Sequence, residues 1–490
     1  MKLRRLLLPG ALLAASVAAT VSWRRQRDAN DGQALPARSR TARNMQVARL
    51  GASLGATYAS TAARKVFASA EKREQLDYER ELKTAEAVAE RLGQMKGAVM
   101  KLGQMASYLD EGLPEPMRAA LAQLQSNAPP MSAALAAEVI QRELGQPPEH
   151  IFVEWDPIPI ASASIGQVHR ALWRDPETGV ERAVAVKVQY PGVAEAIESD
   201  LGTADLLGTI LKQGFSGLDP AEMVAEIRER IVDELDYELE ARNQQAFADY
   251  YRGHPYFHVP EVIAPLSTAR VLTSELVSGA KWDELMTWSA EERDLAAESI
   301  YRFVFRSLYR FRAFNGDPHP GNYLFHGGGR VTFLDFGLVK YFSPEDMATF
   351  EEMITCAVIR PDLARYRQIV ESAGMLAPNA PVDTDEVGRY FWRFYEPVRV
   401  SQTMTWTPEY SSAIVRHTFD RTSPIAQYAT VPRAFVFIQR INLGLYALMG
   451  QLRATGNYRR ISEEIWPMVG AAPSTPMGER ESAWIHAKTG

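Results

Sequence analysis

The pattern of hydrophobic and polar residues changes its period along the chain. Residues 45–108 are rich in Ala, Glu, Lys and Arg and contain no proline, a composition that predicts helices. Residues 167–172 and 183–188 instead alternate or run through β-branched side chains, and the turn-forming sequence Asp-Pro-Glu-Thr-Gly lies between them. These two segments predict a β-hairpin, and residues 271–276 predict a further strand.

Segments with a helical pattern precede and follow these strands along the chain. Two proline pairs bracket a short helix between residues 131 and 146. Asp219 and Pro220 supply an N-cap and a first-turn proline for a long helix that we expect to continue to about Tyr251. The second half of the chain is again mostly helical. This order predicts an α+β fold in which a small β-rich lobe precedes a larger helical lobe.

Charge is distributed unevenly along the chain. The net charge is −6, but residues 1–50 carry ten Lys and Arg against two Asp, and removing their +8 leaves residues 51–490 at −14. An acidic body argues against general nucleic-acid binding, so we expect no nucleic acid among the partners. The single cysteine, Cys356, excludes an internal disulfide and fits a reducing compartment.

Two polar motifs in the helical half carry the residues that phosphoryl transfer requires. Asp317 and Asn322 lie five positions apart in the loop Asp-Pro-His-Pro-Gly-Asn, whose prolines disfavour a helix. Asp335 begins an Asp-Phe-Gly triplet directly after an expected strand at residues 331–334, itself preceded by another at 323–325. Phosphoryl transfer needs a carboxylate near the attacking hydroxyl and oxygen ligands for Mg²⁺.

The spacing of these motifs predicts a role for each residue. Asp317 is expected to act as the base or to orient water, and Asn322 and Asp335 are expected to bind Mg²⁺. A purely structural interpretation makes Asp317 a turn-forming residue and Asp335 a helix cap. Neither structural role explains why the other motif follows at this distance.

A lysine, Lys187, interrupts the apolar strand Val-Ala-Val-Lys-Val. A buried, unpaired lysine is unfavourable, so this side chain needs an anion or a carboxylate partner. Kinases use such a lysine to hold the α/β-phosphates and pair it with a helix glutamate, whereas the alternative is a strand-edge lysine that reaches water. The expected long helix presents Glu234 with Glu238 on one face and Asp236 with Glu240 on another, and the sequence leaves open which face meets Lys187.

The loop before the hairpin contains no Gly-x-Gly-x-x-Gly sequence. In its place stand Ala161, Ser162, Ala163 and Ser164, which restrict the backbone more than glycines and therefore predict a different path around the phosphates. The sequence also contains no Walker A pattern.

Taken together, these motifs resemble the UbiB/AarF family of atypical protein-kinase-like ATPases. The resemblance covers roughly residues 90–345, with the motifs in family order, and includes Lys101 and Gln104 in a Lys-x-Gly-Gln segment. It implies a two-lobe protein-kinase-like fold with a β-rich N-lobe, a helical C-lobe and an N-terminal helical extension that folds over the active site. It also implies that Lys101 of this extension meets Glu234 or Asp236.

The same resemblance assigns roles near the nucleotide. It implies that Glu240 is the partner of Lys187 and that Ala163 tunes the nucleotide preference. The segment that includes Glu275 and Val277 resembles the hinge that meets adenine through backbone atoms.

We therefore expect four parts in the chain. These are a membrane-associated apolar and basic segment with its linker at 1–45, the helical extension at 46–148, the N-lobe at 149–279 and the C-lobe at 280–490. Residues 6–23 are an uncharged run between arginine pairs, and a helix there reaches roughly 27 Å. A signal peptide, a retained anchor and an interfacial helix all fit this run. We favour retention, because export would separate an ATP-dependent domain from its nucleotide.

The expected function is that of an atypical kinase or ATPase. It would use ATP and Mg²⁺ and hydrolyse ATP or phosphorylate a small or lipid-like molecule, in support of isoprenoid-lipid or quinone metabolism. The expected partners are ATP, a lipid or isoprenoid-like molecule, and a membrane surface met through the N-terminus, with the protein in the cytoplasm or on the cytoplasmic side of a membrane. A nucleotide-sensing scaffold without catalysis and a conventional protein kinase are the alternatives. Residues 434–450 contain Arg440 and predict a buried helix rather than a membrane span.

Overall fold

The computed structural model describes residues 132–162, 165–191, 193, 235–316, 318–418, 423–425, 428–429 and 433–489. All of them belong to one compact unit, Lys96–Gly490. The expected N-terminal segment and most of the helical extension lie outside the described residues. So do six expected site residues: Lys101, Gln104, Ala163, Ser164, Glu234 and Asp317.

The N-lobe is built on an antiparallel sheet with the order β1-β3-β4-β6, and β2 pairs with β3. The strands are β1 (Glu154–Trp155), β2 (Ala161–Ser162), β3 (Gly166–Arg174), β4 (Glu181–Gln189) and β6 (Val271–Glu275). β3 and β4 are the predicted hairpin, and β6 confirms the strand predicted at residues 271–276. The hairpin turn begins at Asp175, whose carboxylate accepts a hydrogen bond from the backbone N–H of Glu177 at 2.9 Å.

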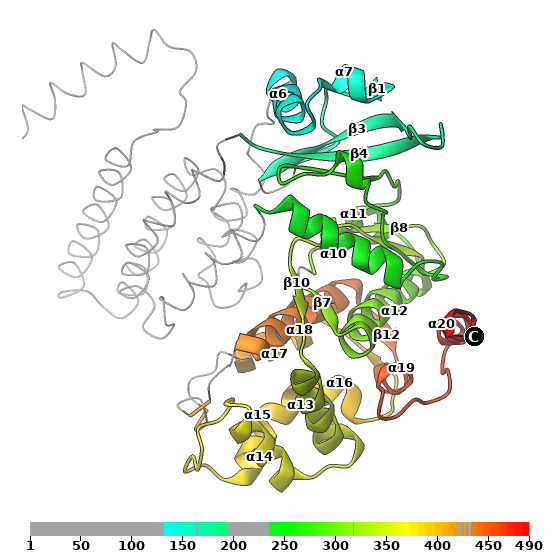
Figure 1. Cartoon of the computed structure of the whole chain (residues 1–490). Helices are drawn as coiled ribbons and strands as arrows, with labels where there is room; N and C mark the ends of the chain where they lie inside the picture. The colour runs from blue at the N-terminus through cyan, green and yellow to red at the C-terminus, as the bar shows by residue number, and fades with distance from the viewer. Residues whose placement is uncertain are drawn as a thin grey trace, which may run out of the picture. The chain divides into compact units, whose positions relative to one another are not determined.

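Two helices, α6 (Ala133–Leu144) and α7 (Pro148–Ile151), precede the sheet and lie above it in Figure 1. α6 is the short helix predicted between the proline pairs. It begins at the cap Ser132 and ends at Gly145, whose φ of 80° suits glycine. Buried side chains of α6 and of the sheet form one core that includes Val139, Ile140, Val184, Val186 and Val188. The helical extension expected at 46–148 includes α6, and the expected domain boundaries stay predictions.

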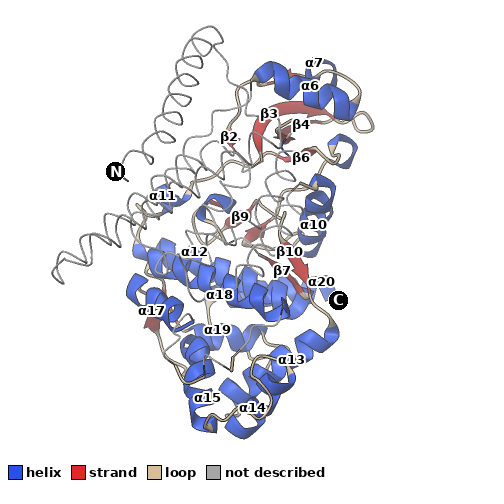
Figure 2. Cartoon of the chain, turned by 90° about the vertical axis from the view of Figure 1, so that its left-hand side faces the viewer, coloured by secondary structure: helices blue, strands red, loops and turns tan. Residues whose placement is uncertain are grey.

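The C-lobe and the segments that join it to the N-lobe contain helices and short strands (Figure 2). The strands are β5 (Phe257–His258), β7 (Ala313–Asn315), β8 (Tyr323–Phe325), β9 (Val331–Phe333), β10 (Val339–Tyr341), β11 (Met404–Thr405) and β12 (Thr455–Gly456). The α-helices are α10 (Tyr237–Tyr250), α11 (Trp282–Leu285), α12 (Ala290–Arg306), α13 (Pro344–Ile354), α14 (Leu363–Ser372), α15 (Thr384–Phe391), α16 (Glu396–Arg399), α17 (Pro408–Thr418), α18 (Arg433–Leu452), α19 (Tyr458–Ile465) and α20 (Pro476–Thr489). The remaining turns are the 3₁₀ segments η1 (Ala264–Leu266), η3 (Pro320–Asn322) and η5 (Trp392–Tyr395) and the π-helical segments η2 (Ser307–Phe311) and η4 (Thr355–Ile359).

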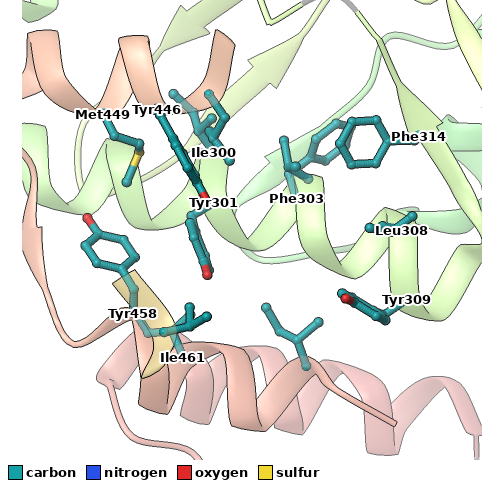
Figure 3. Packing of buried hydrophobic residues seen from close by; sticks show 14 of the residues in the cluster. Ile300, Tyr301, Phe303, Leu308, Tyr309, Phe314, Tyr446, Met449, Tyr458 and Ile461 are labelled. Atoms are coloured by element: carbon teal, nitrogen blue, oxygen red, sulfur yellow. The ribbon is translucent and has the colours of Figure 1, made fainter. Parts of the chain in front are cut away.

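The core of the C-lobe forms where α12 packs against α18 and α19. Figure 3 shows Ile300 and Tyr301 of α12 beside Tyr446 and Met449 of α18, with Tyr458 of α19 below them. The aromatic rings of Tyr301 and Tyr458 lie 4.9 Å apart between centroids. Such ring pairs bury large apolar areas and hold the helices in a fixed arrangement.

The prediction of one helix from Pro220 to Tyr251 is wrong. α10 begins at Tyr237, because the Asp236 side chain accepts a hydrogen bond from the backbone N–H of Leu239 at 3.0 Å and caps the helix. Asp236 has φ −100° and ψ 89°, which is not helical. An aspartate that bonds its own downstream backbone favours a helix start over a helix interior. Asp236 and Glu240 therefore do not share a face of one continuous helix, and Glu234 lies outside the described residues.

The predicted buried helix at residues 434–450 is part of α18. Its C-terminal half buries Leu445, Tyr446 and Met449 in the C-lobe core. Within the part of the chain that the structure describes, no helix combines the length and the apolar character that crossing a membrane requires.

Candidate active site

The site centres on a lysine–glutamate pair between β4 and α10. Successive residues of a strand point to opposite faces, so Lys187 leaves the sheet on the side opposite Val186 and Val188, which are fully buried in the N-lobe core. Lys187 Nζ donates to both carboxylate oxygens of Glu240, each at 2.8 Å. The Lys187 and Glu240 side chains are only 18% and 4% exposed, so the pair is shielded from water.

The surroundings keep Lys187 charged. Burial disfavours the ammonium, but the charges of Glu240, Tyr237 and Asp335 and the hydrogen bond to Glu240 outweigh it and raise the pKa of Lys187 above its ordinary value. Lys187 Nζ also lies 4.8 Å from the ring centroid of Tyr237, within the range of a cation–π interaction. Asp335 lies near this pair, because a Cβ built at Gly337 would be 3.4 Å from Asp335 Oδ1 and 3.7 Å from Glu240 Oε2.

α10 connects this pair to the Asp-Phe-Gly segment. Glu240, Asn243 and Phe247 are spaced by three and four residues and therefore share one face of the helix. Asn243 Nδ2 donates to the backbone carbonyl of Phe336 at 3.2 Å, and the rings of Phe247 and Phe336 are 5.0 Å apart between centroids. One helix face thus positions both the partner of Lys187 and the residue that follows Asp335.

The hairpin of β8 and β9 brings Asn322 and Asp335 to the same end of a small sheet. Tyr323 pairs with Phe333, and the backbone N–H of Leu334 donates to the carbonyl of Asn322 at 3.0 Å. Asp335 Oδ1 accepts from the backbone N–H of Gly337 at 3.0 Å, which turns the chain directly after the aspartate. Both strands were predicted from the sequence, and their pairing places the two proposed metal ligands side by side.

The base of the loop that carries Asp317 is closed by a second strand pair. β7 and β10 are antiparallel, with Asn315 opposite Val339, and Gly316 N–H donates to the Leu338 carbonyl at 2.6 Å. A Cβ at Gly316 would lie about 3.0 Å from Leu338, so a larger residue would push the two segments apart. Asn315 Nδ2 also donates to the carbonyl of Asp335 at 2.5 Å. Asp317 itself lies outside the described residues.

The loop before the hairpin is described only at its first two positions. Ala161 and Ser162 form β2, are exposed, and pair with Val168 and Gln167 of β3. The strand behind them is held tightly, because a Cβ at Gly166 would stand 2.4 Å from the carbonyl oxygen of Val188. This close approach explains the glycine at the first position of β3.

The expected hinge begins at Glu275, the last residue of β6, and its side chains take part in contacts away from Lys187. The Glu275 side chain pairs with His258 Nε2 at 3.1 Å, and this hydrogen bond raises the pKa of His258 and lowers that of Glu275. Glu275 and Val277 line an open pocket of about 960 Å³ that neither Lys187 nor Asp335 lines. The expected contact of this segment with adenine through backbone atoms stays a prediction.

Three residues of the site belong to none of the motifs visible in the sequence. Asn243 and Asn315 bind backbone carbonyls of the Asp-Phe-Gly segment, and Tyr237 packs against Lys187. Only Asn243 has a spacing in the sequence that could have indicated its role. Asn243 follows Glu240 by three positions on an otherwise buried helix stripe, and polar residues at buried positions need a specific partner. Asp236 is one of the two residues expected to meet Lys101, and it caps α10; the other, Glu234, and Lys101 itself lie outside the described residues.

Comparison with known proteins places this arrangement in a family. The model of the ABC1 atypical kinase-like domain matches residues 123–370, about half of the chain. The chain belongs to this family. The region that matches holds β1 to α13 and includes Lys187, Glu240, Asn322 and Asp335, so the family match covers the site described above. The UbiB/AarF resemblance seen in the sequence is confirmed by relatives that carry those names.

Curated members of the ABC1 atypical kinase-like family share about a third of their aligned residues with this chain. The atypical kinase COQ8 of Saccharomyces cerevisiae, a mitochondrial protein, is 31% identical over 286 residues, which are 58% of this chain and 56% of COQ8. The probable protein kinase UbiB of Xanthomonas oryzae is 29% identical over 323 residues, which are 62% of this chain and 58% of UbiB. The chain spans about half the length of these curated relatives.

A solved structure supports the fold over most of the chain. The complex of Rv3197 with erythromycin from Mycobacterium tuberculosis matches with a TM-score of 0.57 and 32% sequence identity. The match covers 81% of this chain and 100% of Rv3197. The two-lobe α+β kinase-like fold predicted from the sequence is confirmed.

Proposed function

We propose that this protein binds Mg-ATP between its two lobes and uses it as an atypical kinase or ATPase. The phosphoryl group goes to water or to a small or lipid-like molecule, and the activity supports isoprenoid-lipid or quinone metabolism. The last part rests on the family resemblance alone. The protein would act in the cytoplasm or at the cytoplasmic side of a membrane.

One observation carries the proposal, the bidentate contact of Lys187 with Glu240 beside Asp335. A shielded lysine with a fixed carboxylate partner is already oriented before a ligand arrives, so little order has to be created on binding. Kinase-type sites use this pair to hold nucleotide phosphates.

The residues of the chain suit the remaining roles. Asn322 and Asp335 offer an amide and a carboxylate oxygen, the donor types that Mg²⁺ prefers. Bound Mg²⁺ would neutralise charge on the phosphates. Asp317 is proposed as the base or water-orienting residue, and Ala161 to Ser164 as the loop that borders the phosphates. The backbone of Glu275 and Val277 is proposed to meet the base.

Replacement of Asp335 tests the catalytic assignment. Asp335→Asn keeps the shape of the side chain but removes a ligand charge, so we expect Mg²⁺-dependent ATP turnover to fall at least 100-fold while circular dichroism stays unchanged. Asp385→Asn changes an exposed carboxylate of α15 and serves as the matched control. Undiminished turnover in Asp335→Asn would rule out the assignment.

The alternatives predict different results. A nucleotide-sensing scaffold would bind ATP, melt at a higher temperature with it and show no turnover in the wild-type protein. A conventional protein kinase would phosphorylate a peptide array. Lipid and quinone profiling of a deletion strain would identify the pathway, and unchanged profiles would remove the isoprenoid part of the proposal.

A further inference from the structure

The C-lobe contains an aromatic cavity that none of Lys187, Glu240, Asn322 and Asp335 lines. Its volume is about 150 Å³, and its walls come from α12, η2, α13, α14, α15, η5, α16, α18 and α19. Seven of the lining residues are tyrosine or tryptophan, and no charged residue lines it among the described residues. Figure 3 shows part of this wall, with Tyr301 and Tyr446 on one side and Leu308 and Tyr309 on the other.

The cavity contains a polar group without a partner. Asn442 of α18 lines it, and the side-chain oxygen of Asn442 is buried with no hydrogen-bond partner among the described residues. A buried acceptor that makes no hydrogen bond is unfavourable, and such groups are rare in folded proteins. An acceptor in this position is what a ligand with one donor would satisfy.

Some of the other polar groups in the wall are satisfied, whereas the buried hydroxyl of Tyr366 also has no hydrogen-bond partner among the described residues. Tyr301 and Ser462 bond one another through their hydroxyls at 2.7 Å, and the Tyr446 hydroxyl donates to the Phe394 carbonyl at 3.0 Å. A water molecule needs two to four polar partners to be held in a cavity. Asn442 Oδ1 and the Tyr366 hydroxyl both lack partners among the described residues, and the rest of the wall is mostly aromatic and aliphatic, so it favours an aromatic ring with a polar substituent.

The wall also contains irregular backbone. Leu308 and Tyr309 belong to the π-helical segment η2, and Ile354 directly precedes the second π-helical segment, η4. π-helical turns are less stable than α-helical ones and occur frequently at functional sites. η2 is followed by Arg312, a non-glycine residue with φ 57°, which is a costly conformation.

We propose that this cavity is a binding site for a small neutral molecule built on one aromatic ring that carries a single hydrogen-bond donor. The volume matches such a ring, since a cavity of about 150 Å³ can hold a benzene-sized molecule. The ring packs among the tyrosine side chains, and the donor points to Asn442 Oδ1. The site is separate from the nucleotide site and does not depend on the proposed kinase activity.

Fluorine NMR on the full-length protein tests the site with a matched pair of probes. Fluorobenzene has the ring alone, and 4-fluoroaniline adds a neutral donor. We expect both to bind and 4-fluoroaniline to bind about 3- to 10-fold more tightly, the range for one net hydrogen bond. Binding of both is expected to persist in the presence of saturating Mg-ATP.

Three variants locate the binding. Asn442→Leu removes the acceptor, so the two probes should bind equally. Leu443→Phe, also in the wall, fills part of the cavity and should abolish binding of both, and Gln451→Ala changes an exposed residue of the same helix and should change neither. Circular dichroism verifies that each variant is folded. Absence of binding to the wild type, competition by Mg-ATP, or a probe preference that persists in Asn442→Leu would overturn the proposal.

Discussion

Glu240 neutralises the ammonium group of Lys187, which is largely buried. Breaking a buried ion pair leaves the remaining charge uncompensated, which typically costs about 3 kcal/mol or more. We therefore expect Glu240→Gln to lower the free energy of unfolding by about 3 kcal/mol and the affinity for ATP at least 10-fold. Denaturant titration and calorimetry measure the two effects.

Glu238→Gln is the matched control for this prediction. Glu238 lies on the exposed side of α10, and its carboxylate is 4.0 Å from Arg242, so its loss should change stability by less than about 0.5 kcal/mol. Equal effects of the two substitutions would contradict the role of Glu240.

The raised pKa of Lys187 makes the stabilisation by this pair depend on pH. The stabilisation by this pair is fully present below the unfolded lysine pKa and is lost only at higher pH, as the pH rises through the folded value.

His258 is a second residue whose titration the structure predicts. Its hydrogen bond to Glu275 raises its pKa, so the contact stabilises the protein below the unfolded histidine pKa of about 6.5 and is lost as the pH rises through the folded value. NMR titration of His258 should give a pKa above 6.5, and Glu275→Gln should lower it. A pKa that does not respond to this substitution would mean that the pair does not form in solution.

The sequence indicated the buried lysine but not its partner, for reasons visible in single residues. Lys187 stood out because it interrupts an apolar strand, a local pattern. Glu240 could not be chosen from four acidic residues, since the choice depends on where α10 begins. That point is set by Asp236, which was expected on the helix and instead caps it. Asn315 had no signal of its own, because its partner, the Asp335 carbonyl, is a backbone atom 20 residues away.

At the scale of elements, a buried carboxylate of α20, Glu481, forms ion pairs with α12. Glu481 lies 2.9 Å from Arg302 Nη1 and 2.6 Å from Arg306 Nε, both on α12, and 3.4 Å from His254 Nε2. Burial disfavours its charged form, but the His254 hydrogen bond and both arginines hold the pKa of Glu481 well below its ordinary value. Trp484 adds a hydrogen bond to the Arg252 carbonyl just beyond α10.

Removing this carboxylate should release the helix. Glu481→Gln leaves two buried guanidinium groups with fewer partners, so we expect a loss of about 3 kcal/mol in stability and faster hydrogen exchange in α20. The effect should be full above the unfolded glutamate pKa of about 4.3 and should disappear as the pH falls through the folded value. Arg480→Gln, on the exposed side of α20, is the control, and similar exchange in both variants would contradict the prediction.

At the scale of the whole molecule, the sequence predicted what local patterns determine. The hairpin, β6, β8, β9 and α6 each follow from periodicity and turn residues, and the motifs gave the order of the two lobes. The docking of α20 on α12 and the C-lobe cavity depend on contacts between residues more than 100 positions apart, for example between Arg302 and Glu481. No periodicity along the chain encodes such contacts.

The uneven charge of the chain leads to a final prediction, about membranes. Residues 1–50 carry +8 and include the uncharged run at 6–23, whereas residues 51–490 carry −14 and should be repelled by an anionic bilayer. We expect the full-length protein to float with vesicles that contain phosphatidylglycerol and the protein without residues 1–45 to remain in solution. Because an apolar segment in the bilayer is held by burial rather than by charge, 1 M salt should not release the full-length protein. Release by salt would show that the basic residues alone attach it, and flotation of the truncated protein would place the membrane contact elsewhere. Retained ATP-dependent melting of the truncated protein serves as the control for folding.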